Sequence, residues 1–564
     1  MKKCLRSALV AMVAALPMVT SAQTRYFDPI FEESEIVVET GVVYAQNINF
    51  LLSNFTSPNT LPNLGELSTI ADAGGSFPAA YFDPTDASTA VKLQNIRMDV
   101  YYPNIELDTE TSRPVIIYLH TGNFLPTPLN GSTTGLMNDS AAVYLCREWA
   151  KRGYVAVSMD YRLGWNPIAS TVQERRGTLL NAVYRAIHDL KAGIRFLRGN
   201  SENPYNIDPE KFVVYGQGSG GYVAQAAATL DNAETELFLE KFLPNPFNPA
   251  VSYVDTLQVG TVDGFGFPNS LNLYRPSPVS ADFQVSINAG GALADESWLE
   301  AGDAPMMAIN CVRDDFAPFN VGTVIVPTTL EEVVDVDGPN VFIKKANDLG
   351  NNAAFANIPN GDPYTDAARA LYGETIEVSN DGSITIETGV EGLYPLIRPL
   401  RPFLANESGP WEWWDPNSAI SQTVVGNVGG NPITAHMASL NSNPDMSAEK
   451  GMAYLDTING YILPRIACVF NFAGSVCAPD NVNEKESSNT FSVYPNPAND
   501  RVAVVAEATI NMFQLIDITG KVVAERQNIN ATNLVFNVNE YPSGVYFVQL
   551  NTVKGRVTQK LIIE

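Results

Sequence analysis

The sequence predicts an α/β domain built on a mostly parallel sheet, followed by a small all-β domain. Residues 114–120 and 212–215 are continuous apolar runs, which are typical of strands buried on both faces of a parallel sheet. Between them, apolar residues recur at helical spacing from Leu179 to Leu197. After residue 491, short alternating strands separated by Gly- and Pro-containing turns indicate a small β-sandwich.

The net charge of the chain indicates which kinds of macromolecule it can bind. The chain has 564 residues, too many for one ordinary domain, and its formal net charge is −26. Nucleic-acid binding needs clustered Lys and Arg, so this acidic balance argues against it. An acidic surface of this kind keeps an exported protein in solution.

The first 22 residues predict a secretory signal peptide. Lys2, Lys3 and Arg6 form a basic start, residues 8–19 are apolar, and residues 20–22 fit a small-residue cleavage site. No later apolar run reaches the length of a transmembrane helix. We therefore expect an exported chain without a transmembrane segment.

Four cysteines follow the signal peptide. Cys468 and Cys477 are close in sequence and could form a disulfide, which export permits. Cys146 and Cys311 stand in apolar segments and are expected to be buried thiols. No Cys or His spacing indicates a zinc site, so we expect no metal and no cofactor.

The other elements of the first domain follow in chain order. Two insertions between core strands are expected, at about residues 231–282 and 351–430, and both are rich in aromatic residues and Pro or Asn. The expected strands are residues 36–44, 92–103, 153–159, 284–288 and 305–312, and the expected helices are residues 142–152, 222–230, 341–349 and one from about Ser447.

The stretch from Lys211 to Tyr222 joins a strand to a helix through a glycine-rich turn. This arrangement resembles the nucleophile elbow of the α/β-hydrolase family of carboxylesterases and lipases, in which Gly, any residue, Ser, any residue and Gly follow a strand. Gly216 follows the strand here, so the serine is expected at 218. Position 218 is glycine, and Ser219 stands one residue late.

Whether the elbow carries a nucleophile depends on which residue occupies the central position of the turn. One step along a helix rotates a side chain by roughly 100°, so Ser219 is not expected to point where the nucleophile must. Glycine at 218 also removes the strain that an elbow residue normally carries. We therefore interpret this turn as an esterase-like elbow without its nucleophile.

Two more segments resemble this family. His120-Thr-Gly-Asn-Phe124 resembles its His-Gly-Gly oxyanion loop, which implies that backbone N–H groups of Thr121, Gly122 and Ser219 would face a developing negative oxygen. Residues 153–164 match its next strand and turn, where we expect Asp160 and Arg162 to pair.

The resemblance also implies an acid and a base. Asp314 lies four residues before Pro318, as the family's acid does, and His436 is the last of three histidines. The family's order of nucleophile, acid and base then selects Ser219, Asp314 and His436. Each also has a structural interpretation: Asp314 as a solvated turn residue, and His436 as a loop histidine.

Two functions remain open at this point. A secreted, non-catalytic protein would bind a small-molecule ester or a glycan in the old cleft, because Gly218 stands at the elbow. Alternatively, an active secreted esterase would use Ser219, Asp314 and His436 on polysaccharide-linked or small acyl esters.

The end of the chain resembles the C-terminal sorting domain of the type IX secretion system of Bacteroidetes. The resemblance rests on the blocks 494–497, 517–521, 542–546 and 560–564, read as Tyr-Pro-Asn-Pro, Asp-Ile-Thr-Gly-Lys, Pro-Ser-Gly-Val-Tyr and Lys-Leu-Ile-Ile-Glu. It implies that the secretion machinery is a partner and that the protein is released or attached to the cell surface. We expect the hydrolase-like domain over residues 23–480, a linker over 481–490 and the sorting domain over 491–564.

Overall fold

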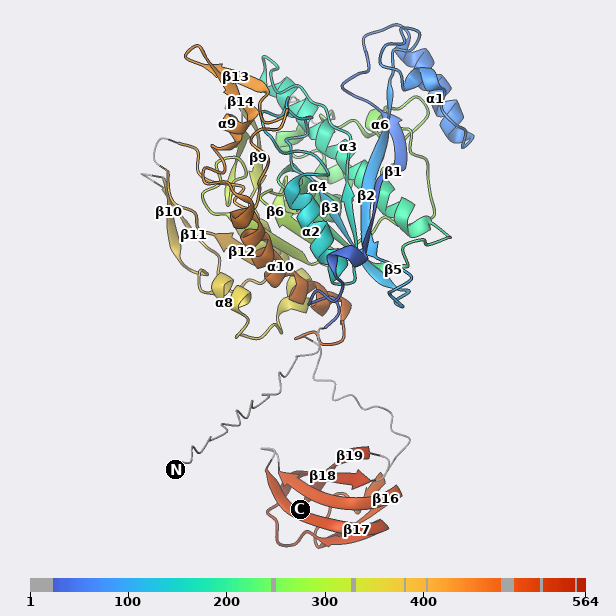
Figure 1. Cartoon of the computed structure of the whole chain (residues 1–564), viewed down its shortest axis with the longest axis vertical. Coiled ribbons are helices and arrows are strands. Elements are labelled where there is room, and N and C mark those ends of the chain that lie inside the picture. Colours follow the sequence, from blue (N-terminus) through green and yellow to red (C-terminus); the bar gives the residue numbers. More distant parts are fainter. Residues whose placement is uncertain are drawn as a thin grey trace, which may run out of the picture. The chain divides into compact units, whose positions relative to one another are not determined.

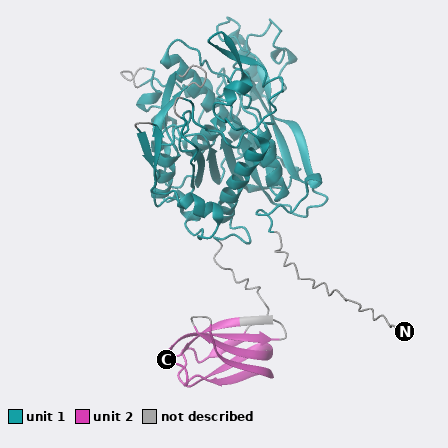
Figure 2. Cartoon of the chain, turned by 60° about the vertical axis from the view of Figure 1, so that its left-hand side comes forward, with its two compact units in different colours: residues 1–478 teal, residues 479–564 magenta. Residues whose placement is uncertain are grey.

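The computed structural model describes residues 24–244, 250–325, 331–379, 382–401, 404–477, 491–517, 521–552 and 555–563. The chain divides into two compact units between Ala478 and Pro479 (Figure 2). The expected signal peptide, residues 1–22, and the expected linker, residues 481–490, lie outside the described residues. Each unit has a hydrophobic core of its own.

An eight-stranded sheet forms the centre of the larger unit (Figure 1). Strands β4, β3, β5, β6, β7 and β12 run parallel, and β1 and β2 add antiparallel pairs at one edge. The mostly parallel sheet is thereby confirmed. In sheet order the strands are β1 (Ile36–Ile48), β2 (Leu93–Pro103), β4 (Val155–Met159), β3 (Arg113–Leu119), β5 (Ile207–Gln217), β6 (Val285–Ala289), β7 (Met306–Cys311) and β12 (Leu393–Leu396).

Both faces of the sheet are covered by helices. Along β3, Val115 and Ile117 enter one hydrophobic core, and Ile116 and Tyr118 enter the other. Because both faces are buried, the strand is a continuous apolar run. The first core is covered by α3 (Val172–Gly199), α4 (Ser219–Thr229) and α7 (Pro339–Asp348), and the second by α2 (Ser140–Lys151) and α10 (Ala448–Phe470).

The expected second insertion needs a correction. We expected residues 351–430 to lie outside the core, but β12 falls within that range and pairs with β7 in the main sheet. This strand has four residues, Leu-Tyr-Pro-Leu, and its proline and its length hide it among the surrounding loops. The other elements of the larger unit are α1 (Thr60–Asp72), α5 (Ala233–Glu236), α6 (Thr256–Val259), β8 (Val321–Ile325), β9 (Glu332–Asp337), α8 (Pro363–Arg369), β10 (Thr375–Ser379), β11 (Gly382–Thr385), β13 (Val424–Val428), β14 (Asn431–Thr434) and α9 (Ala435–Ser439).

The smaller unit is a five-stranded antiparallel sheet around its own apolar core. Short alternating strands were expected here, but residues 501–517 form one long strand with shifts of register between Val505 and Met512. No Gly or Pro interrupts residues 507–511, so the chain continues through an irregularity instead of turning. The strands are β15 (Phe491–Tyr494), β16 (Arg501–Asp517), β17 (Val522–Asn537), β18 (Gly544–Thr552) and β19 (Gly555–Ile563).

The cysteines behave as the sequence indicates. Cys468 and Cys477 form a disulfide, and Cys146 and Cys311 are buried free thiols. Across the part of the chain that the structure describes, no helix is both long and apolar enough to cross a membrane.

Candidate functional site

The turn between β5 and α4 has the backbone of a nucleophile elbow. Gly218 lies between the two elements with φ 53° and ψ −118°, a conformation that is essentially restricted to glycine or to strained functional residues. Its N–H donates to the Ala289 carbonyl at 2.8 Å, at the end of the neighbouring strand β6. Gly218, and not Ser219, therefore occupies the apex of the turn.

A second residue fills the space above this apex. A Cβ built on Gly218 would lie 2.2 Å from Thr121 Oγ1 and 2.9 Å from Thr121 Cβ. Both distances are far below van der Waals contact, so a serine at 218 and a threonine at 121 exclude each other in this geometry. Thr121 stands where the resembled family has a small residue, and the sequence alone did not reveal that the two substitutions complement each other.

Ser219 is the first residue of α4 and is 5% exposed. Its Oγ lies 3.2 Å from the Tyr161 hydroxyl, and that hydroxyl donates to the His120 carbonyl at 2.8 Å. Because the Tyr161 O–H donates its hydrogen bond to His120, the Ser219 O–H is the donor in the hydrogen bond between Ser219 and Tyr161. Burial raises the pKa of Tyr161, and a neutral phenol of this kind cannot take a proton from serine.

Asp314 follows β7 and lines the same cavity as Gly218. Its carboxylate accepts hydrogen bonds from the backbone N–H groups of Phe316 (2.8 Å) and Ala317 (3.0 Å). Burial raises the pKa of Asp314 to about 7, against the lowering effect of these two bonds. The carboxyl is therefore only half ionised near neutral pH.

His436 lies on the short helix α9, and its Nδ1 accepts a hydrogen bond from Trp414 Nε1 at 3.0 Å. Within the described residues, it shares no hydrogen bond with Asp314 or Ser219, and it is not among the residues that line the cavity. The structure thus brings Ser219 and Asp314 to one cavity but does not bring His436 to them. Trp414, 22 residues earlier in sequence, holds the imidazole elsewhere.

The other two histidines are engaged below the cavity. His120 is 1% exposed, with Nδ1 donating to the Thr121 carbonyl and Nε2 lying 3.2 Å from an Asp160 carboxylate oxygen. Burial lowers the pKa of His120, but the hydrogen bond and charge of Asp160, together with the Thr121 carbonyl and the charge of Asp139, outweigh it and the net shift of the pKa is upward. His188 is fully buried against Asn272. Neither imidazole lines the cavity, so the described lining contains no histidine base.

The expected pair of Asp160 and Arg162, in the loop after β4, does not form. Asp160 contacts His120 and not Arg162, because Arg162 turns inward to a fully buried ion pair with Asp189 on α3 (2.8 Å). The Tyr274 hydroxyl also donates to Asp189, at 2.6 Å. This pair anchors the loop that carries Tyr161 beneath the elbow.

Two of the three expected oxyanion donors, Gly122 and Ser219, have backbone N–H groups without a partner in the described chain. Both residues line the cavity. Gly122 adopts φ 121°, which is open to glycine, and a Cβ at this position would lie 2.8 Å from Gly135 Cα. Two N–H groups at this place remain available to a ligand oxygen.

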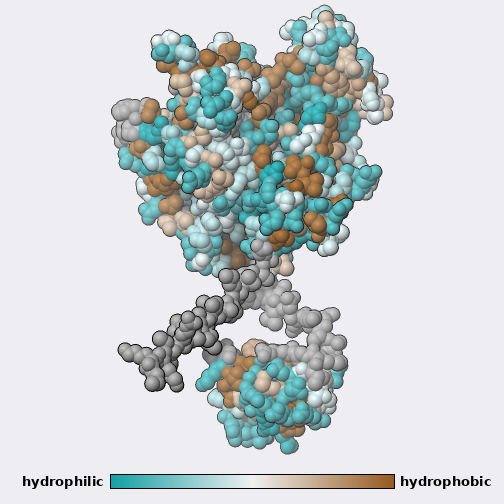
Figure 3. Space-filling model, in the orientation of Figure 1, coloured by the Kyte–Doolittle hydropathy of each residue, from teal (hydrophilic) through white to brown (hydrophobic). Residues whose placement is uncertain are grey.

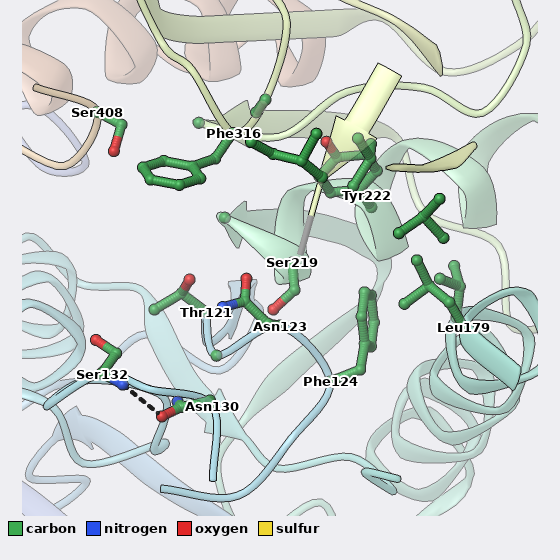
Figure 4. Close-up of a pocket in the computed structure, with 18 of the residues that line it drawn as sticks. Thr121, Asn123, Phe124, Asn130, Ser132, Leu179, Ser219, Tyr222, Phe316 and Ser408 are labelled. Atoms are coloured by element: carbon green, nitrogen blue, oxygen red, sulfur yellow. Dashed lines mark hydrogen bonds between the residues drawn. The ribbon is translucent and has the colours of Figure 1, made fainter. Parts of the chain in front are cut away.

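The cavity has a volume of about 480 Å³ and two halves of different character. Figure 4 shows Ser219 between polar residues, including Thr121, Asn130 and Ser132, and apolar residues, including Phe124 and Leu179. Elements α3, α4, β8 and β9 supply a large part of the apolar wall, and residues 130–134, 408–412 and 438–442 supply much of the polar wall. Figure 3 shows apolar residues gathered along a notch at the upper end of the larger unit.

Glu412 is a cavity residue that the sequence did not single out. Its Oε1 accepts hydrogen bonds from Gln217 Nε2 (2.7 Å) and Thr134 Oγ1 (3.3 Å). Burial, assisted by the nearby Asp139, raises the pKa of Glu412 to about 8. It follows that Glu412 is mostly uncharged at neutral pH. A lone Glu between tryptophans in a loop carries no sequence signal for this position.

Comparison with known proteins supports both parts of the chain. The BD-FAE family model matches residues 98–276, and the secretion system C-terminal sorting domain matches residues 492–564. A neuroligin-like protein, glit-1 of Caenorhabditis elegans, is 26% identical over 150 residues, which is 24% of this chain and 18% of that protein. The chain therefore spans less than a fifth of the length of this curated relative.

Solved structures of Thermogutta terrifontis esterase 2 are also similar. The cyclosarin-phosphonylated form is 17% identical, with a TM-score of 0.27 over 46% of this chain and 75% of that one. The butyrate-bound form is 17% identical, with a TM-score of 0.28 over 46% and 76%. The sorting domain indicates secretion or cell-surface attachment through the type IX system. The chain thus contains an α/β-hydrolase-type domain matched by BD-FAE and a C-terminal secretion sorting domain.

Proposed function

We propose that this protein is a secreted, non-hydrolytic member of the esterase-like fold that binds a small molecule in the former catalytic cleft. The observation that carries the proposal is the pair Gly218 and Thr121. Glycine stands at the apex of the elbow, and the threonine side chain fills the space that a nucleophile's Cβ would need.

The surroundings support binding in place of hydrolysis. A serine nucleophile needs a base within hydrogen-bond reach, and the partner of Ser219 is the Tyr161 phenol. Meanwhile the cleft keeps the features of a ligand site: a cavity of about 480 Å³, apolar walls, and unused N–H groups at Gly122 and Ser219. Asp314 and His436 then serve the structure of their own loops.

The chain from Gln23 onward is expected to hydrolyse p-nitrophenyl acetate and butyrate no faster than its Ser219→Ala variant. Loss of a triad nucleophile costs about 10⁶-fold in kcat. We therefore expect the hydrolysis rate of the wild type to be no higher than the background rate. The measurement is the initial rate at pH 7–8, with both proteins checked for equal folding by circular dichroism. Turnover that Ser219→Ala abolishes would instead support the alternative of an active esterase that uses Ser219.

A further inference from the structure

Several polar side chains of the cavity are free to form hydrogen bonds with a ligand. The side chains of Thr121, Asn123, Ser408 and Asn441 line it, and none of them makes a hydrogen bond within the described chain. Ser408 and Asn441 come from neighbouring loops, since the Ser408 N–H donates to the carbonyl of Ser442 (3.0 Å). Together these groups offer both donors and acceptors, which suits a ligand rich in hydroxyl groups.

The opposite half is aliphatic. Branched side chains of α3, β8 and β9 form much of its wall, and most of these residues are part of the core of the larger unit or pack against it. Val183 and Leu180 of α3 are only half-buried and face open cavity space. Covering an apolar surface of this kind with an apolar chain is favourable, because both surfaces are removed from water.

The charges of the lining exclude one class of ligand. No Lys, Arg or His is among the described residues that line the cavity, and its two ionisable acids are Asp314 and Glu412. Burial raises the pKa of Glu412 to about 8, so this carboxyl stays mostly neutral at pH 7 and can itself donate a hydrogen bond. An anionic head group would find no cationic side chain among the described residues of the lining.

We propose that the cavity binds an uncharged amphiphile, with a hydroxyl-rich head group against Asn123, Ser408 and Asn441 and an aliphatic chain along α3 and β9. This inference names the ligand class and rests on the proposed function. Ser219 lies where the two halves meet (Figure 4), so the junction of head and chain passes over the elbow turn that precedes it.

The test uses n-octyl β-D-glucoside, which has a sugar head and an eight-carbon chain but no ester bond. Binding to the full chain from Gln23 is measured at pH 7 by calorimetry, below the micelle concentration. Trp165, Trp298 and Trp411 line the cavity and supply a fluorescence signal. We expect octanoate to bind at least 10-fold more weakly and glucose at least 100-fold more weakly. Equal or tighter binding of octanoate, or no binding of the glucoside, would overturn the proposal.

Matched variants locate the site. Val183→Phe fills the apolar half and is expected to weaken glucoside binding at least 10-fold, whereas Leu257→Phe, on a 72% exposed residue outside the cavity, leaves it unchanged. Should Val183→Phe fail to fold, Asn441→Ala tests the polar half with an expected 3- to 10-fold loss. Unchanged affinity in a folded cavity variant contradicts the assignment.

The two proposals fail separately. Because the glucoside is not an ester, its binding does not depend on hydrolysis. Ester turnover with glucoside binding in the cavity would overturn the non-hydrolytic function and leave the ligand class standing. Tight octanoate binding without ester turnover would overturn the ligand class and leave the non-hydrolytic function standing.

Discussion

Gly218→Ser is expected to destabilise the protein by about 2–6 kcal/mol and to confer no esterase activity. The new Cβ would lie 2.2 Å from Thr121 Oγ1, and overpacking of this kind costs roughly 1–3 kcal/mol. A non-glycine residue at φ 53° and ψ −118° adds a further strain of about 1–3 kcal/mol. No activity is expected, because the described cavity lining has no histidine to act as base.

A double-mutant cycle isolates the contact with Thr121. Thr121→Gly should rescue Gly218→Ser by about 1–3 kcal/mol, since it removes the overlap and leaves the backbone strain. Gly74→Ser is the matched control, because Gly74 has a similar φ of 63° but no atom within 4 Å of the Cβ position. Free energies of unfolding come from urea titration of the chain from Gln23. A cost at 218 no greater than that at 74, or additive effects in the cycle, would show that Thr121 does not fill the site.

The second large effect is expected at the buried ion pair behind the elbow. Asp189→Asn should cost about 3–5 kcal/mol of stability, because it leaves the fully buried Arg162 without its counter-charge. Asp189 also accepts hydrogen bonds from the Arg162 backbone N–H (2.7 Å) and the Tyr274 hydroxyl (2.6 Å). Denaturant unfolding at pH 7 measures the loss.

Two controls give this prediction its meaning. Asp348→Asn breaks an exposed pair with Lys344 and is expected to change stability by less than about 1 kcal/mol. Replacing both buried partners, as Arg162→Met with Asp189→Leu, should recover part of the loss, since no unpaired charge remains. If the Asp189→Asn variant were as stable as Asp348→Asn, water would solvate Arg162 or another acidic group would supply its counter-charge, and the prediction would be wrong.

The sequence predicted the parts of the fold and the site that depend on local pattern. Residues 115–119 of β3 and 212–215 of β5 are continuously apolar because both faces of the sheet are covered. The glycine at 218 was identified by its place two residues after Gly216, which follows the apolar run of residues 212–215. Strand β12 was missed because four residues with a proline carry too little pattern.

The rest of the site depends on contacts between distant segments. Thr121 meets Gly218 across 97 positions of sequence, and Glu412 meets Gln217 across 195. His436 was chosen because it is the last histidine, but the direction of an imidazole depends on its neighbours, and here Trp414 is its partner. Such pairings follow from the folded topology and not from spacing or residue type.

The most direct test of the central claim is covalent labelling with a fluorophosphonate, a reagent that phosphonylates activated serine nucleophiles. Intact mass spectrometry of the chain from Gln23, after exposure to the reagent at pH 8, reports any added phosphonyl group. The vacant elbow at Gly218 predicts an unchanged mass under conditions that fully label an active serine esterase run in parallel. A stoichiometric adduct that maps to Ser219 or Thr121 would contradict it and would mean that the cleft holds a working nucleophile.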